Sequence, residues 1–253
     1  MAATGVAPQR FADRTIVVTG AGGGIGRATS LQLLAEGARV IAADVAGDRL
    51  DALAKEADGD RLRTVVGDLT RQDAVDEVVA AGEGAIDGLV NVAGITDGWL
   101  PCGEMDDDTW HRVLDLNVTM PMRVARSLLP QMLDRGRGTL VFVSSEASFR
   151  SSLSGAAYTT SKHALNGLVK SIAYYYAPRG IRANAVAPGG VATDMDIAFR
   201  SDYAQERVAP MLATVTPIVQ PDEIARPLLW LLSDDAPNVN GVVLPSDGGW
   251  STL

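Results

Sequence analysis

The sequence is poor in the residues that build disulfides and metal sites. It contains one cysteine, Cys102, and two histidines, His111 and His163, among 253 residues. A disulfide within the chain and a cysteine metal site are therefore excluded, and two histidines leave little for zinc. We expect no metal.

Long apolar runs and excess positive charge are also lacking. No run of about 18 apolar residues occurs, which argues against a membrane span. The formal charge is −9, which argues against binding to a nucleic-acid backbone. The first residues, MAATGVAPQRFADR, lack a basic stretch followed by an apolar one, so we expect no secretory signal and a reducing, cytoplasmic location.

Short apolar runs alternate with helical patterns along nearly the whole chain. The expected strands are 15–19, 38–43, 62–66, 86–92, 139–143, 181–187 and 241–244, and the expected helices are 24–36, 47–57, 71–81, 107–133, 156–177 and 222–232. Buried strands separated by helices predict a parallel sheet. No linker or repeat interrupts the pattern. We therefore predict one α/β domain over 1–253, a Rossmann-type doubly wound sheet of about seven strands with helices on both faces.

A glycine cluster follows the first expected strand. It reads Thr19-Gly-Ala-Gly-Gly-Gly-Ile-Gly26 and opens a helix. Glycines let backbone N–H groups approach a pyrophosphate, and a helix N-terminus attracts its charge. The spacing places Gly20, Gly24 and Gly26 in a T-G-x-x-x-G-x-G pattern. Arg27 stands where a Walker loop would need lysine, so a dinucleotide is favoured over a nucleoside triphosphate.

Asp44 ends the second expected strand, 24 residues after Gly20. An acid at this place can accept hydrogen bonds from ribose hydroxyls and repels a 2′-phosphate, so it favours NAD over NADP. Gly23 offers no basic side chain to counter that repulsion. A solvated aspartate that caps the next helix is the structural alternative.

Tyr158 and Lys162 lie four residues apart on an expected helix and therefore share a face. A neighbouring ammonium lowers the pKa of a phenol, which suits tyrosine for acid–base chemistry. The chain has only three lysines among 22 basic residues, yet one stands here. Packing of the aromatic ring beside a solvated lysine is the alternative for this pair alone.

Three further features strengthen this interpretation. Ser144 and Ser145 end the expected strand 139–143, where a hydroxyl could bind a substrate oxygen. Pro121 crowds the carbonyl of Asn117 four residues earlier, so we expect a kink there and a freed carbonyl that binds water. The segment Pro188-Gly-Gly-Val-Ala-Thr193 follows another strand and could bind a carboxamide.

Together these residues resemble the short-chain dehydrogenase/reductase family, from about Arg14 to Gly249. The resemblance includes Asp68 after the third strand, Asn91-Val-Ala-Gly94 after the fourth, and Asp247-Gly-Gly249 after the last. The family commonly shows N-N-A-G where this chain has Val92 as the second residue.

The resemblance implies hydride transfer with Tyr158 as the acid/base. Lys162 would lower the Tyr158 pKa and hold the nicotinamide ribose, Ser145 would orient the substrate oxygen, and Asn117 would anchor a water. The implied cofactor-binding residues are Gly20, Gly24, Ile25, Gly26, Asp44, Val45, Asp68, Leu69, Asn91, Ala93, Gly94, Tyr158, Lys162, Pro188, Gly189, Val191 and Thr193. Family members usually assemble as dimers or tetramers, so a homo-oligomer is implied.

The substrate pocket is expected from three loops, 95–101, 146–157 and a lid over about 195–217. The lid offers Met195, Ile197, Phe199, Met211 and Leu212 with Arg200 and Arg207. This mixture suits a mostly apolar substrate with one anionic end, or a lid that simply packs onto the body. Glu146, directly after Ser145, either contacts substrate or faces solvent.

The leading hypothesis is an NAD-dependent enzyme that interconverts a secondary alcohol and a ketone. One alternative is a 3-oxoacyl carrier-protein reductase, which would need basic residues such as Arg135, Arg137 and Arg179 near the site. Another is a non-catalytic NAD-binding sensor or scaffold, which should have lost Tyr158 or Lys162. A serine hydrolase is disfavoured because no G-x-S-x-G motif is present.

Overall fold

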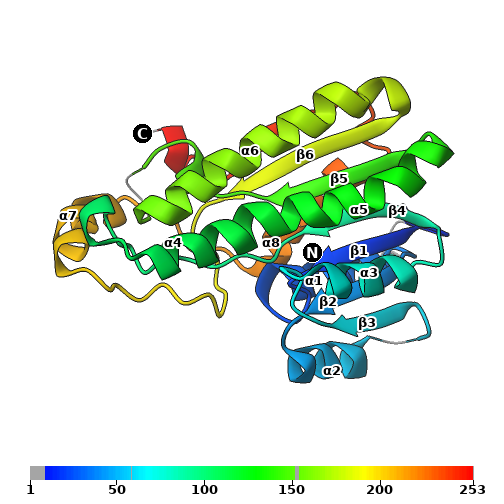
Figure 1. Ribbon diagram of the computed structural model, residues 1–253, viewed down its shortest axis with the longest axis horizontal. Coiled ribbons are helices and arrows are strands. Elements are labelled where there is room, and N and C mark those ends of the chain that lie inside the picture. Colours follow the sequence, from blue (N-terminus) through cyan, green and yellow to red (C-terminus); the bar gives the residue numbers. More distant parts are fainter. Residues whose placement is uncertain (1–8, 58, 152–153, 253) are drawn as a thin grey trace, which may run out of the picture.

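Seven strands form one parallel sheet in the computed structural model, which describes residues 9–57, 59–151 and 154–252 (Figure 1). The strands are β1 (Thr15–Thr19), β2 (Arg39–Asp44), β3 (Leu62–Val66), β4 (Ile86–Asn91), β5 (Gly138–Val143), β6 (Ile181–Pro188) and β7 (Val243–Ser246). Their order is β3-β2-β1-β4-β5-β6-β7, and each neighbouring pair is parallel. This confirms the predicted fold class.

Helices cover both faces of the sheet. They are α1 (Gly24–Ala35), α2 (Gly47–Glu56), α3 (Gln72–Ala81), α4 (Asp107–Leu114), α5 (Met120–Arg135), α6 (Ala156–Tyr176), α7 (Asp202–Leu212) and α8 (Pro221–Leu232). Apolar residues of α3, α5 and α6 form one buried cluster with the strands, and those of α1, α2 and α8 form a second cluster with the opposite face. The central strands are buried along nearly their whole length, so successive residues supply apolar side chains to both layers.

The helix expected over 107–133 is not continuous, which corrects that expectation. It is divided into α4, a π-helical segment Asp115–Thr119 and α5. Pro121 lacks an N–H and crowds the preceding turn, and the Met120 N–H instead bonds the Asp115 carbonyl, five residues back. The chain thus accommodates the proline with a π turn at Asn117. Binding of water to the Asn117 carbonyl stays a prediction.

The helical spacing predicts that α1 buries Ile25, Ala28, Leu31 and Leu34 on one face, and this is partly wrong. Leu34 is buried together with Leu33, whereas Ile25, Ala28 and Leu31 are only half-buried. The reason for Ala28 and Leu31 is that they line the open pocket beside the glycine loop, on the part of α1 that no other element covers.

The expected lid contains one helix, α7, preceded by an irregular segment. Both lie beyond the carboxyl ends of the strands, at the left of Figure 1. None of the helices described is long and apolar enough to cross a membrane.

Candidate active site

The glycine loop joins β1 to α1 at the centre of the sheet. Gly20 has a φ of 65°, a backbone conformation that glycine adopts without strain. A Cβ at Gly26 would lie 2.0 Å from the Gly20 carbonyl oxygen, so only glycine lets the helix pack on the loop. The N-cap, Gly23, gives α1 no side-chain cap, and the first turn carries no acidic residue. The N–H groups there are arranged as an anion-binding helix N-terminus requires.

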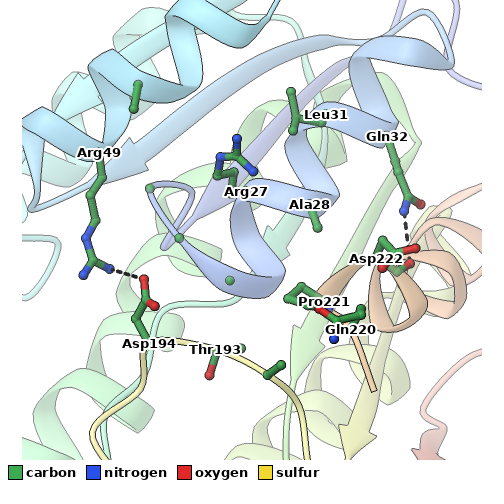
Figure 2. Close-up of a pocket in the computed structure, with 15 residues that line it drawn as sticks. Arg27, Ala28, Leu31, Gln32, Arg49, Thr193, Asp194, Gln220, Pro221 and Asp222 are labelled. Atoms are coloured by element: carbon green, nitrogen blue, oxygen red, sulfur yellow. Dashed lines mark hydrogen bonds and ion pairs between the residues drawn. The ribbon is translucent and has the colours of Figure 1, made fainter. Parts of the chain in front are cut away.

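An open pocket of about 580 Å³ borders this loop (Figure 2). Arg49 of α2 reaches across it to Asp194, with an N–O distance of 3.6 Å. Thr193 lies against Gly24, where an added Cβ would be 2.9 Å from the threonine methyl. The pocket therefore joins the first βα turn to the segment that follows β6, as a dinucleotide site needs.

Asp44 lies at the end of β2, beside the glycine loop. One carboxylate oxygen accepts the Gly22 N–H at 2.9 Å and the other accepts the Ala46 N–H at 2.9 Å. The Cβ of Arg49 lies on the other side of Gly22, since a Cβ added at this glycine would meet Arg49 Cβ at 2.9 Å and Asp44 Oδ2 at 3.0 Å. The guanidinium of Arg49 extends to Asp194 instead. The sequence alone did not place Arg49 here. Asp44 therefore orders the glycine loop.

The remaining residues of the expected adenosine end lie after β2 and β3. Val45 is 72% exposed and therefore free to contact a ligand. Asp68 is exposed and accepts hydrogen bonds from the N–H and hydroxyl of Thr70, while Leu69 is buried. Among them, only Val45 and Asp68 offer an accessible surface.

The segment after β4 is held by a threonine of β1. The Thr19 hydroxyl oxygen accepts the N–H groups of Val92 and Ala93 at 3.1 and 3.3 Å, and its own hydrogen bond reaches the buried Asn91 at 3.3 Å. Gly94 follows, and a Cβ there would lie 3.3 Å from Asn117 Oδ1 and 3.5 Å from Lys162 Nζ. The segment 91–94 therefore approaches Asn117 and Lys162 at Gly94.

Asn117 is buried in the π-helical segment and clamps the backbone of the loop after Gly94. Its Oδ1 accepts the Ile95 N–H and its Nδ2 donates to the Ile95 carbonyl, both at 2.9 Å. Nδ2 also lies 3.0 Å from the hydroxyl of Ser161 on α6. The carboxamide therefore joins three elements, and sequence reasoning did not identify Ser161.

Lys162 and Tyr158 face the same space from α6, as their spacing predicted. Lys162 is 3% exposed, its Nζ donates to the Val143 carbonyl at 3.0 Å, and it lies 5.5 Å from the centroid of the Tyr158 ring. Burial lowers the pKa of Lys162 to about 8. The hydrogen bond to Val143 therefore anchors Lys162, and with it the helix that carries Tyr158, at the end of β5.

The expected lowering of the Tyr158 pKa is wrong for this arrangement. Burial raises the pKa of the phenol, a hydrogen bond from Ser145 opposes that rise, and the nearby charge of Asp97 adds to it. Lys162 Nζ lies 5.5 Å from the ring centroid and donates its hydrogen bond to Val143 rather than to the phenol. The phenol consequently keeps its proton at neutral pH.

Ser145 begins a short 3₁₀ helix, Glu146–Ser148, directly after β5. Its hydroxyl accepts the Ala147 N–H at 3.1 Å and bonds Tyr158. The neighbouring Ser144 instead donates to Asn166 inside the protein. Ser145 is therefore the serine that shares the site with the tyrosine.

Glu146 does not face solvent, which corrects one of its two expected roles. Its carboxylate pairs with Arg150, and burial raises its pKa. Arg150 in turn donates to the Trp250 carbonyl and lies over the Trp250 ring. Glu146 thus joins the loop after β5 to the end of the chain. Residues 152 and 153 of the expected pocket loop lie outside the described residues.

The segment after β6 approaches the site by backbone contacts. Pro188 pairs with Ser246 in the sheet, and the Gly189 N–H donates to the Ser246 carbonyl at 3.3 Å. Val191 forms an isolated bridge with Val219. These contacts direct Thr193 toward Gly24.

The lid residue Arg200 is bound to Thr109 and Asp106, so it is not free for a substrate.

The expected catalytic residues lie together in this site. The three arginines that a 3-oxoacyl carrier-protein reductase would need near the site lie elsewhere. Arg135 binds the carbonyls of Gly84 and Ile86 at the start of β4, Arg137 pairs with Asp87 there, and Arg179 directly precedes β6. All three lie at the amino ends of the strands, opposite the glycine loop. Among the described residues, no group of three or more histidine, cysteine, aspartate or glutamate side chains could hold a metal.

Comparison with known proteins assigns the family. The sequence model of the short chain dehydrogenases matches residues 14–204. The chain is 37% identical to the short-chain dehydrogenase/reductase olcF of Penicillium canescens, over 95% of this chain and 98% of olcF. It is 36% identical to 3beta-hydroxysteroid dehydrogenase 2 of Eggerthella lenta, over 95% and 96% of the two chains.

A solved structure agrees with these relatives. A putative NAD(P) dependent gluconate 5-dehydrogenase from Beutenbergia cavernae, with bound NADP, superposes with a TM-score of 0.86 at 37% identity, covering 97% of this chain and 100% of that one. Sequence, fold and the order of the site residues point the same way. The chain is a member of the short-chain dehydrogenase/reductase family of oxidoreductases.

Proposed function

We propose that this protein is an NAD-dependent oxidoreductase that interconverts a secondary alcohol and a ketone, with Tyr158 as the general acid/base. The observation that carries the proposal is the convergence of Asn117, Ser145, Tyr158 and Lys162 from three separate segments. A Cβ added at Gly94 would lie 3.3 Å from Asn117 Oδ1 and 3.5 Å from Lys162 Nζ, and Ser145 bonds Tyr158. A phenol, a hydroxyl and an ammonium around one space form an acid–base site for a carbonyl oxygen.

Each residue has a role that its contacts support. The Ser145 hydroxyl orients the substrate oxygen, and the Tyr158 phenol donates its proton to that oxygen or removes it. Burial raises the pKa of Tyr158, so the phenol is protonated at neutral pH and can donate its proton to a ketone oxygen. Lys162 holds the ribose and Asn117 keeps the loop after Gly94 in place.

The residues present fit a nicotinamide dinucleotide. The glycine loop offers uncapped N–H groups for a pyrophosphate, and the open surface around Val45 and Asp68 suits an adenosine. The remaining contacts are assigned to Ile25, Leu69, Asn91, Ala93, Pro188, Gly189, Val191 and Thr193. When bound, the cofactor supplies the hydride chemistry. Asp44 favours NAD because its charge repels a 2′-phosphate, although the Beutenbergia cavernae relative holds NADP.

We assign the substrate side to a pocket of about 350 Å³ between Trp99, the start of α6 and α7. It adjoins Tyr158 in sequence at Thr159, and Arg207 is the one cation among its lining residues. Arg207 forms no hydrogen bond or ion pair with the residues described between 9 and 252. A relative is named as a hydroxysteroid dehydrogenase, which fits a bulky apolar secondary alcohol.

We further propose a single nucleotide-binding domain over 1–253 with a substrate lid over about 195–217, a cytoplasmic location and a homo-oligomer. Tyr174 and Tyr175 of α6 are 79% and 69% exposed, and such apolar exposure fits a subunit contact.

The test is NAD- and NADP-linked turnover on a panel of secondary alcohols and ketones, with Tyr158→Phe as the matched variant. We expect turnover with NAD that falls by about 10²- to 10⁴-fold in the variant while NADH still binds. Undiminished turnover in Tyr158→Phe contradicts the role of the tyrosine. NADH binding without turnover on any compound would favour a carrier-bound substrate or a sensor.

A further inference from the structure

Asp97 is a buried carboxylate in the loop between β4 and α4. Its side chain is 1% exposed. One oxygen accepts the N–H groups of Trp99 and Gly155, both at 3.1 Å, and the other accepts the Tyr158 N–H at 2.9 Å. A single carboxylate therefore holds three backbone N–H groups from two segments that lie about 60 residues apart in sequence.

The contacts matter because α6 has no cap of its own. Its N-cap residue is Gly155, which has no side chain to receive the first N–H groups of the helix. A Cβ at Gly155 would lie 2.4 Å from Asp97 Oδ2, so the glycine leaves room for the carboxylate. Asp97 thus does from another loop what an aspartate N-cap does within a helix, and its charge is favourable at the positive end of the helix.

The same carboxylate also fixes the loop that receives the lid. Trp99 has a φ of 63°, a conformation that a bulky residue adopts only when its surroundings hold it. Its ring stacks on Phe199 with centroids 4.6 Å apart, and its Nε1 donates to the Ile197 carbonyl at 3.0 Å. The lid segment before α7 therefore packs on the ring of Trp99, and the backbone N–H of this tryptophan is bound to Asp97.

We propose that Asp97 is a positioning residue for the reaction, which fixes the Tyr158 end of α6 and the Trp99 seat of the lid relative to each other. Asp97 acts through the backbone of Tyr158 and does not itself contact substrate. The inference rests on the proposed function of Tyr158. It gives a reason for a carboxylate that is buried, since a buried charge is costly unless hydrogen bonds satisfy it.

The charged side chains near Tyr158 are Lys162 of the same helix and Asp97 of the loop after β4. The hydroxyl of Ser145, which follows β5, bonds the phenol. Lys162 is present in every variant below. A change in the titration of Tyr158 on replacing Asp97 therefore reports the carboxylate.

The experiment compares Asp97→Asn and Asp97→Ala with the wild-type enzyme, using the alcohol and cofactor that the turnover panel identifies as active. Asparagine keeps the shape and one acceptor, and alanine removes both acceptors. The control is Asp87→Asn, since the Asp87 carboxylate also accepts a backbone N–H, that of Thr15 at 3.0 Å, but at the opposite end of the sheet. The readouts are kcat, KM for cofactor, the pH profile of kcat and Tm.

We expect kcat to fall about 10- to 100-fold in both variants, because small displacements of an acid–base group are costly, with less loss in Asp97→Asn. The KM for the cofactor should be the same in both variants as in the wild-type enzyme. The midpoint of the pH profile for alcohol oxidation should move to lower pH in both, because a negative charge beside the phenol has been removed. Asp87→Asn should lower Tm without moving the profile.

Three outcomes overturn the inference. The first is a wild-type kcat and pH profile in Asp97→Asn, which would leave Asp97 without a role. The second is a lower Tm with no shift of the pH profile, and the third is a variant that does not fold. Either of these two would leave Asp97 with a role in stability alone. Tyr158→Phe separates this failure from that of the proposed function. An inactive Tyr158→Phe beside an unaffected Asp97→Asn rejects the positioning role alone, whereas an active Tyr158→Phe rejects the acid–base assignment.

Discussion

The ammonium of Lys162 donates a hydrogen bond to the carbonyl of Val143, at a distance of 3.0 Å, inside the protein. Val143 is the last residue of β5, and Ser145 follows two residues later. The bond therefore ties the helix that carries Tyr158 to the strand that leads into Ser145. One lysine contact fixes the two sides of the acid–base site relative to each other.

Replacement of Lys162 by methionine should stabilise the folded protein at neutral pH while removing activity. Burial lowers the Lys162 pKa from 10.5 to about 8, so the unfolded chain binds more protons between these values and stability rises with pH across that window. Below pH 8 the whole penalty for the buried charge is present, about 3 kcal/mol at most, and the lost hydrogen bond offsets about 1 kcal/mol of it.

The measurement is the Tm of both proteins at pH 7 and pH 10. We expect Lys162→Met to exceed the wild type at pH 7 and the difference to shrink at pH 10. Lys170→Met, which replaces an exposed lysine of the same helix, should change neither value. A lower Tm for Lys162→Met at pH 7 would show that the ammonium stabilises the fold.

Replacement of Gly26 by alanine should damage both folding and cofactor binding. The new methyl would lie 2.0 Å from the Gly20 carbonyl, so the loop and α1 must separate. We expect a loss of about 1–3 kcal/mol of unfolding free energy and a Kd for NADH raised at least about 10-fold. The test is chemical denaturation with NADH fluorescence titration.

A matched glycine is available on α6 as the control for Gly26→Ala. A Cβ at Gly167 would meet nothing within 4 Å, so Gly167→Ala should gain up to about 1 kcal/mol through helix propensity. Equal effects of the two substitutions would contradict the packing role of Gly26.

Replacement of Asp44 by alanine should weaken NADH binding and relax discrimination against NADPH. The carboxylate orders the Gly22 N–H and offers the charge that repels a 2′-phosphate, while the guanidinium of Arg49 remains in the pocket beside the glycine loop. We expect the Kd for NADH to rise about 10-fold and that for NADPH to fall. Asp48→Ala, which changes an acid of α2 in the same βα unit, should leave both constants as they are. Unchanged affinities in Asp44→Ala would reject its role.

Local patterns in the sequence determined the sheet, the glycine loop and the pairing of Tyr158 with Lys162. Apolar strands, glycines and a four-residue helical spacing each act over a few neighbouring residues, so their effects can be inferred without the rest of the chain. The resemblance to a family assigned roles to Asn117 and Ser145. The division of the helix at Asn117 followed in part from Pro121, but the π-helical form that resulted did not.

Only the tertiary structure decided the contacts between distant segments. Asp97 meets Tyr158 across 61 residues, Arg49 meets Asp194, and Glu146 is buried with Arg150 rather than exposed. The raised pKa of Tyr158 has the same origin, since burial outweighs the hydrogen bond from Ser145. Desolvation and capping depend on which surfaces the packed chain brings together, and the spacing of residues along the sequence does not contain that information.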